Sequence, residues 1–142
     1  MITIFFKTLV VSALIGMTAS AQILNNTVIA AGQFKGAGMA HSAQGNATLF
    51  KMNQGLYVNL DKNFFVTEGP DLFLILRSSK IQSAGMFIIT PLKQYKGSQN
   101  YKINLSESDL VKYDQVIIYC KRYTTLFAIA SLTFNPKAFV RR

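Results

Sequence analysis

Short apolar runs recur along the chain from residue 32 onward, with glycine, asparagine or aspartate between many of them. After a glycine-flanked start at Phe34, the runs cover Gly45–Phe50, Leu56–Leu60, Phe64–Thr67, Leu72–Leu76, Met86–Thr90, Asn100–Leu105, Gln115–Cys120 and Leu126–Leu132. Strands spaced roughly 8–12 residues apart with turn residues between them are typical of sandwiches and barrels. The pattern therefore predicts an all-β fold, an antiparallel β-sandwich or barrel of about eight or nine strands.

The apolar residues of these runs supply the expected core. It comprises Phe34, Leu49, Leu56, Val58, Phe65, Leu72, Leu74, Ile89, Ile103, Val116, Ile118, Leu126 and Ala128. One stretch departs from the strand pattern: Ser106 is followed three residues later by Asp109, which is the capping-box arrangement of a helix start. Leu110 and Tyr113 would face one side of a single turn, so we expect one short helix there and no other in the β domain.

The first residues have the features of a secretory signal peptide. Lys7 precedes an apolar stretch from Thr8 to Met17, and Ala19-Ser20-Ala21 fits a signal-peptidase site, so we expect cleavage after Ala21. The apolar stretch is shorter than the roughly 20 residues that span a bilayer, although an uncleaved anchor is the alternative. We expect a signal peptide at 1–21, a lead-in at 22–31, a β domain at 32–134 and a basic tail at 135–142. The mature protein would be periplasmic or secreted, with no integral membrane span.

The chain is basic, with 15 Lys and Arg against 6 Asp and Glu. The excess is spread along the sequence rather than concentrated in a run of five or six like charges, so no nucleic-acid-binding arm is indicated. Such a surface is compatible with simple solvation, or with attraction to an anionic surface or an acidic redox partner.

Cys120 is the only cysteine and His41 is the only histidine. Secreted proteins usually pair their cysteines, so a single thiol calls for an explanation. Cys120 shares one face of an alternating strand with Val116 and Ile118, where a small buried hydrophobe belongs. A packed core residue, a reactive or ligating thiol and an intermolecular disulfide are therefore all open. No nucleophile–base–orienter set can be assembled, which argues against an enzyme.

Two further motifs have both a structural and a functional interpretation. Glu68 and Asp71 flank Gly69-Pro70, where they would form a turn or contact a cation or ligand at a loop. The stretch 97–100, which contains Gln99, could be a phosphate cradle, but it lacks the lysine and the strand–loop–helix context of one. We expect a shaped turn there.

Three blocks of sequence carry a resemblance to a known family. They are Gly36–Gly45, Asn63–Leu72, and a third set made of Pro91–Lys93, Gly97–Tyr101, Tyr113–Cys120 and Phe127–Ala130. In this order they resemble the DM-thirteen domain, a small extracellular or periplasmic module that accompanies DOMON domains in Skeletor-type proteins of animals. The resemblance covers nearly the whole mature chain.

The resemblance implies an electron-transfer role in which the family's cysteine acts as a bare thiol or holds a prosthetic group. That cysteine corresponds to Cys120, and the family's histidine-containing block falls on His41. The chain has Tyr119 where relatives often carry Trp, and Tyr123 where they often carry Phe. Both positions stay aromatic, and either tyrosine could line a cofactor pocket beside Cys120.

Ligand chemistry limits which cofactor the resemblance can imply. Covalent c-type haem needs a Cys-x-x-Cys-His attachment, and a blue-copper site needs two histidines and a cysteine, so both are excluded. Four-ligand Cys/His zinc is excluded in the same way. Non-covalent haem on Cys120 is left, or a soft metal held by Cys120, His41 and one of Met39, Met52 or Met86. The leading hypothesis is an electron-transfer or redox-responsive domain that uses Cys120 and a redox partner protein; the alternative is a non-redox binding or scaffold module.

Overall fold

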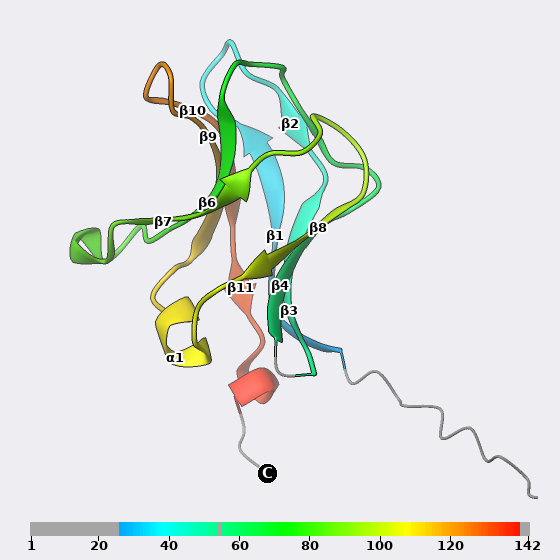
Figure 1. The fold of residues 1–142 in the computed structure, drawn as a ribbon, viewed down its shortest axis with the longest axis vertical. Helices are drawn as coiled ribbons and strands as arrows, with labels where there is room; N and C mark the ends of the chain where they lie inside the picture. The colour runs from blue at the N-terminus through cyan, green and yellow to red at the C-terminus, as the bar shows by residue number, and fades with distance from the viewer. Residues whose placement is uncertain (1–25, 54, 140–142) are drawn as a thin grey trace, which may run out of the picture.

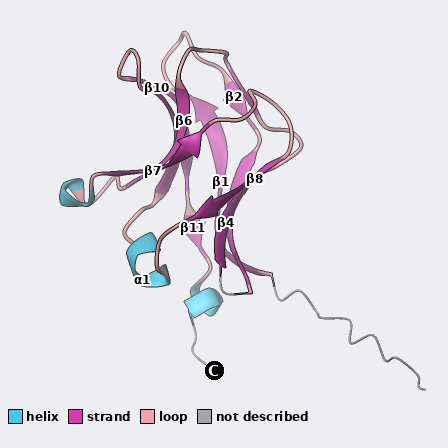
Figure 2. Cartoon of the chain, in the orientation of Figure 1, coloured by secondary structure: helices cyan, strands magenta, loops and turns pink. Residues whose placement is uncertain are grey.

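The computed structural model describes residues 26–53 and 55–139, so the predicted signal peptide lies outside the described residues. The strands are Thr27–Gly36 (β1), Ala43–Gln44 (β2), Asn46–Met52 (β3), Gly55–Leu60 (β4), Phe65–Val66 (β5), Leu72–Arg77 (β6), Met86–Pro91 (β7), Gln99–Ile103 (β8), Gln115–Cys120 (β9), Thr125–Ser131 (β10) and Thr133–Phe134 (β11). The helical elements are Glu107–Leu110 (α1) and two 3-10 turns, Gln82–Ala84 (η1) and Pro136–Phe139 (η2). Strands dominate the described part of the chain (Figure 2).

The strands form one antiparallel sheet that is nearly closed, in the order β7-β6-β9-β10-β1-β3-β4-β8, with β11 also paired to β1 (Figure 1). β1 joins the two halves of this sheet. Its first part, from Thr27 to Gln33, pairs with β3, and its last residues, Phe34 to Gly36, pair with β10. β2 and β5 form a separate two-stranded sheet. The predicted fold class, with its eight or nine main strands, is confirmed.

The core lies inside this sheet and matches most of the prediction. Ten of the expected residues are buried: Phe34, Leu49, Leu56, Val58, Leu72, Leu74, Ile103, Val116, Ile118 and Ala128. Ile89 and Leu126 are only partly buried. The prediction that Phe65 belongs to the core is wrong. Its side chain is 37% exposed, whereas its neighbours Phe64 and Val66 are buried. With Val66 facing inward, the alternation of a strand turns Phe65 outward.

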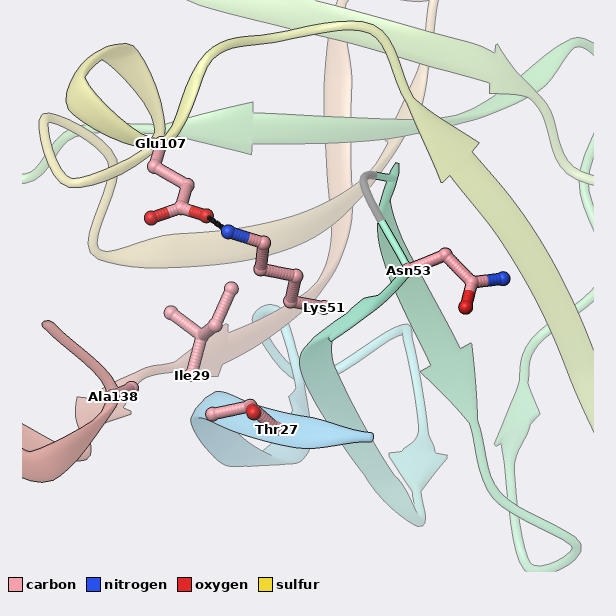
Figure 3. Close-up of a pocket in the computed structure, with 6 residues that line it drawn as sticks. All are labelled: Thr27, Ile29, Lys51, Asn53, Glu107 and Ala138. Carbon is pink, nitrogen blue, oxygen red and sulfur yellow. Dashed lines mark hydrogen bonds and ion pairs between the residues drawn. The ribbon is translucent and has the colours of Figure 1, made fainter. Parts of the chain in front are cut away.

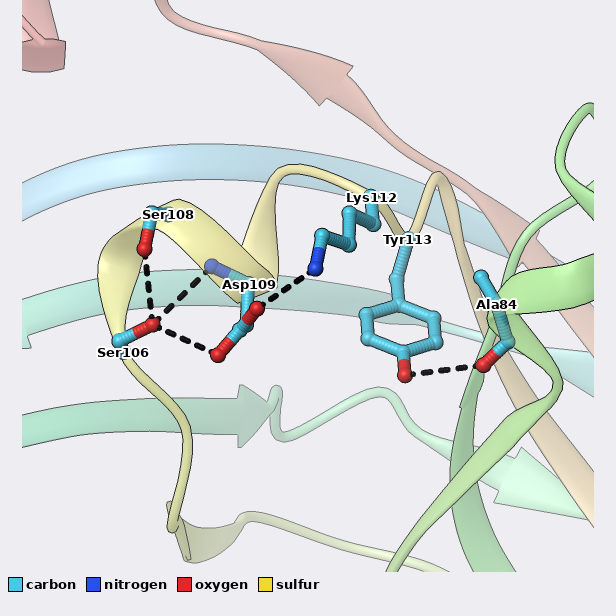
Figure 4. A network of polar contacts seen from close by, with 6 residues as sticks. All are labelled: Ala84, Ser106, Ser108, Asp109, Lys112 and Tyr113. Atoms are coloured by element: carbon cyan, nitrogen blue, oxygen red, sulfur yellow. Dashed lines mark hydrogen bonds and ion pairs between the residues drawn. The ribbon is translucent and has the colours of Figure 1, made fainter.

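The expected helix is present at the expected place (Figure 4). Ser106 is its N-cap, and the Ser106 hydroxyl accepts a hydrogen bond from the backbone N–H of Asp109. Lys112 donates to the Asp109 carboxylate over 2.7 Å, and this bond lowers the pKa of Asp109. Leu110 and Tyr113 face the core, and the Tyr113 hydroxyl donates to the carbonyl oxygen of Ala84 over 3.2 Å.

The edges of the domain differ in detail from the sequence pattern. β1 begins at Thr27 and so takes up the second half of the segment 22–31, which carries no clear strand pattern of its own. The two-residue strands β2 and β11 are too short to show a period. Among the described residues, no helix has the length and apolar character needed to cross a membrane.

Candidate functional site

Five loops gather at one end of the domain, which we call the loop end. They comprise residues 37–42, 61–64, 67–71, 92–98 and 121–124 and lie at the top of Figure 1. The opposite end carries α1, η2 and the last residues of β3. His41 lies within the first of these loops, and Cys120 is the last residue before the fifth. The fold therefore brings both candidate residues to the loop end.

Cys120 is fully buried at the end of β9. Its partners across the sheet are Leu72 of β6 and Thr125 of β10. The thiol donates a hydrogen bond to the carbonyl oxygen of Pro70, which lies 3.0 Å from Sγ in the turn before β6. Because this bond uses the S–H proton, the geometry is that of a protonated thiol enclosed beneath the Gly69-Pro70 turn.

His41 is held by a ring contact and a backbone contact. Its imidazole stacks on the ring of Phe127, with 3.9 Å between centroids and 26° between planes. Its Nδ1 lies 3.1 Å from the carbonyl oxygen of Ala37 and donates to it when the proton is on that nitrogen. The loop folds back tightly at Gly36, where a Cβ would lie 1.9 Å from the carbonyl oxygen of His41, so a larger residue would displace the loop.

Phe127 and Gly69 connect the histidine to the thiol. A Cβ on Gly69 would lie 2.5 Å from Cε2 of Phe127, so the ring packs directly against the glycine backbone. Contacts therefore run from His41 through Phe127 and the Gly69-Pro70 turn to Cys120. His41 and Cys120 each bond a backbone carbonyl rather than each other, so the structure brings them to one site without forming a dyad.

The two tyrosines near Cys120 lie away from its sulfur. Tyr119 precedes Cys120 in β9, so its side chain points to the opposite, outer face, where its strand partners are Phe73 and Leu126. Tyr123 is 63% exposed at the tip of the loop after β9. The ammonium group of Lys121 lies 4.6 Å above the Phe73 ring, on the outer face of the sheet. That charge is therefore directed to an aromatic ring and not to the thiol.

The turn that contains Glu68 and Asp71 shapes the entry into β6. Asp71 has a φ of 59°, in the left-handed region, and its carbonyl oxygen accepts a hydrogen bond from the backbone N–H of Lys121 over 3.1 Å. This bond fixes the turn against the residue that follows Cys120. The backbone of Asp71 therefore holds the Gly69-Pro70 turn in place over the thiol. Glu68 lines a groove at the loop end.

Gln99 stabilises the loop between β7 and β8 from within. It is buried, and its Nε2 donates to the carbonyl oxygens of Gln94 and Gly97 over 2.9 and 3.2 Å. Its Oε1 accepts from the backbone N–H of Gln94 and from the hydroxyl of Tyr101. This amide therefore serves as the internal brace of a shaped turn, in line with the structural interpretation of the 97–100 stretch.

A groove of about 860 Å³ opens at the loop end beside this turn. We call it the aromatic groove, and its lining includes Lys62, Phe65, Glu68, Gln94, Tyr95 and Lys96. It adjoins the Gly69-Pro70 turn above Cys120, because the Tyr95 hydroxyl donates to the carbonyl oxygen of Gly69 over 3.0 Å. A smaller pocket of about 230 Å³ lies at the opposite end, where Lys51 and Glu107 form an ion pair (Figure 3).

The candidate cofactor ligands are not gathered around the sulfur. Met39 is fully exposed, Met86 is 49% exposed at the start of β7, and Met52 lies at the end away from Cys120. Among the described residues, no group of three or more His, Cys, Asp or Glu side chains is placed to hold a metal ion. With the thiol enclosed and bonded to Pro70, these residues as they lie do not fit haem or a soft metal.

Phe127 and Gly69 are the site residues that strand alternation does not find. The register of β10 shifts between Leu126 and Ala128, so Phe127 and Ala128 are both buried in succession. Such a bulge breaks the two-residue period that the sequence pattern relies on. Gly69 stands beside proline in a turn and within the Asn63–Leu72 block, and neither signal reveals the ring that packs on it.

Comparison with known families gives a match over most of the chain. The family model described as electron transfer DM13 matches residues 33–132, from within β1 to the residue after β10. The matched region includes Cys120, His41, Phe127 and the Gly69-Pro70 turn. No curated protein and no solved structure matches the chain.

Proposed function

We propose a redox-responsive electron-transfer role for this chain, because it belongs to the electron transfer DM13 family and carries a single enclosed thiol in the matched region. Cys120 is the residue on which this role depends. The observation that carries the proposal is the hydrogen bond from the Cys120 thiol to the carbonyl oxygen of Pro70. The residue after Pro70, Asp71, accepts a hydrogen bond from the backbone N–H of Lys121 in the loop after β9.

This bond couples the state of the sulfur to the shape of the turn. In a one-electron step, Cys120 gives an electron to an oxidised partner protein and its thiol proton leaves to solvent, and the reverse step restores the thiol. The oxidised sulfur has no proton to donate, so the Pro70 carbonyl loses its partner at a buried position. The Gly69-Pro70 turn would then rearrange at the surface, where a partner protein can sense the redox state.

Electron exchange through space suits this geometry better than thiol–disulfide exchange. A disulfide reaction requires a second sulfur to approach the thiolate in line, and Cys120 is fully buried. Contacts through the Gly69-Pro70 turn and the stacked rings of Phe127 and His41 connect the sulfur to the loop end. We place the contact with the redox partner at this end for that reason.

We further propose that the protein is exported and acts in the periplasm or outside the cell. The support is the signal-peptide pattern of the first 21 residues, which predicts a mature chain that begins at Gln22. Mass spectrometry of the protein recovered from fractionated cells tests this proposal. An intact Met1 end on all of the protein would contradict it.

The basic character of the chain favours an acidic redox partner or an anionic surface. The formal net charge is +9 for the full sequence and +8 once Lys7 is removed with the signal peptide. Such a chain attracts acidic proteins at low ionic strength, and this attraction raises the rate of encounter more than the final affinity. Salt should therefore slow electron exchange with an acidic partner and have the opposite effect with a basic one.

The test of the redox role compares folded variants during oxidation by a soluble one-electron acceptor. Wild-type protein should transfer one electron per chain, detected by EPR after rapid freezing and by the mass of trapped products. Cys120→Ser should transfer none, whereas Tyr123→Phe, which removes the oxidisable hydroxyl of an exposed phenol, should behave as wild type. Equal exchange by folded Cys120→Ser and wild type would overturn the proposal in favour of a non-redox binding or scaffold module.

A further inference from the structure

We propose that the aromatic groove binds an acidic oligosaccharide, with uronate carboxylates at Lys62 and Lys96 and sugar rings against Phe65 and Tyr95. This binding function goes beyond the electron-transfer role and does not depend on Cys120. It rests on the rigidity of the groove floor, the exposure of its aromatic rings and the balance of its charges.

The floor of the groove is built from paired backbone. Phe65 of β5 lies directly opposite Lys96, and flanking hydrogen bonds join the Val66 N–H to the Tyr95 carbonyl and the Gly97 N–H to the Phe64 carbonyl, both over 2.9 Å. On its other side β5 pairs with β2. The side chains that line the groove therefore project from fixed backbone positions, which lowers the entropic cost of binding.

The two aromatic rings are accessible and held in place. Phe65 is 37% exposed and Tyr95 is 38% exposed, although both stand within an ordered pairing of strands. The Tyr95 hydroxyl is bonded to Gly69, so this ring is anchored at its polar end. The negative face of an aromatic ring attracts the polarised C–H groups on the flat face of a sugar, so such rings are suitable stacking platforms.

The charged and polar lining selects the kind of sugar. Lys62 and Lys96 supply two ammonium groups against the single carboxylate of Glu68, so the groove has an excess of positive charge. Gln94 and Glu68 offer hydrogen-bonding groups for sugar hydroxyls, an amide with both donors and acceptors and a carboxylate that only accepts. The volume of about 860 Å³ lies in the range of small-molecule sites, roughly 300–1,000 Å³.

The test uses titration calorimetry at low salt with hexagalacturonate as the probe and its methyl ester as the uncharged match. We expect the acid to bind and the ester to bind about tenfold more weakly or not at all. Two variants should each raise the Kd about tenfold: Phe65→Ala, and the double variant Lys62→Gln with Lys96→Gln. A double variant with Lys80→Gln and Lys137→Gln removes the same charge from outside the groove and should retain the wild-type Kd.

Hexaglutamate distinguishes a sugar site from a general anion site. It carries the charges without the rings, so we expect it to bind at least about tenfold more weakly than hexagalacturonate. Failure of wild-type protein to bind hexagalacturonate, equal binding of hexaglutamate, or an equal loss in the Lys80/Lys137 control would each overturn the proposal. Because all the substituted side chains are exposed or partly exposed, thermal unfolding of each variant should match wild type and exclude misfolding as the cause.

Discussion

The imidazole ring of His41 stacks on the phenyl ring of Phe127 with a centroid separation of 3.9 Å. This contact ties the loop after β1 to β10, and Phe127 in turn packs against Gly69, one residue before the carbonyl that accepts the Cys120 thiol. The loop end is thus a set of linked contacts. A substitution of any of these residues should displace the others, because closely packed groups transmit displacement.

Replacing His41 tests the stack. We expect His41→Ala to lower the free energy of unfolding by about 1–2 kcal/mol, since both the ring contact and the bond to Ala37 are lost. His41→Phe keeps a ring and should recover part of that loss. Denaturant titrations of the two variants measure the difference. Equal stability of His41→Ala and wild type would show that the contact contributes nothing.

Replacing Gly69 tests the packing over the thiol. A Cβ there would lie 2.5 Å from Phe127, so Gly69→Ala should destabilise the protein by about 1–3 kcal/mol and displace the turn. The displaced turn should also speed labelling of Cys120 by an alkylating reagent. Gly38→Ala is the matched control, because its Cβ would meet no atom within 4 Å and only its φ of 70° is strained. That control should leave the labelling rate unchanged.

Much of the fold follows from the sequence, because turn residues punctuate apolar runs of strand length. The apolar pattern predicts Phe65 in the core, whereas the structure buries Phe64 and exposes Phe65. This difference shows the limit of the pattern. β5 has only two residues and pairs with β2 and with Lys96, outside the main sheet. A run of Phe64, Phe65 and Val66 is apolar throughout, so its period does not show which ring faces inward.

The candidate site is less accessible to sequence reasoning than the fold. The inward direction of Cys120 follows from its alternation with Val116 and Ile118. Its bond to Pro70 does not, because the two residues are 50 positions apart and meet only through the pairing of β6 with β9. Likewise, the burial of Phe127 depends on a register shift in β10 that no turn residue marks.

The buried hydroxyl of Tyr101 makes the stability of the protein depend on pH in the alkaline range. Burial raises the Tyr101 pKa above its ordinary 10.0, and the hydrogen bond from the Lys93 backbone lowers it by less. The folded state thus favours the neutral phenol. Its contribution to stability is complete below the unfolded pKa near 10 and is lost as the pH rises through the higher folded pKa.

We therefore expect the free energy of unfolding to fall above about pH 10, and Tyr101→Phe to weaken that fall. Tyr101→Phe should also be less stable at neutral pH, because Gln99 and the Lys93 N–H lose a partner. Tyr95→Phe serves as a control, since Tyr95 is 38% exposed. Denaturant midpoints at several pH values measure the slopes. Identical slopes in Tyr101→Phe and wild type would contradict this assignment.

The last prediction separates enclosure of the Cys120 thiol from its redox role. The side chain is fully buried, so an alkylating reagent should react slowly with native protein and rapidly with unfolded protein. Cys120→Ser places a shorter, more polar group beneath Pro70, and Cys120→Ala leaves the Pro70 carbonyl without its donor. Each should cost about 1–3 kcal/mol of stability.

Those stability losses are expected whether the thiol is core packing or a redox centre, so electron exchange is the deciding measurement. A redox centre predicts that both folded variants lose exchange completely while His41→Phe retains most of it, because the latter leaves the sulfur in place. Core packing predicts that all three exchange electrons as wild type does. Partial loss that follows the stability of each variant would likewise place the thiol in the packing and not in the chemistry.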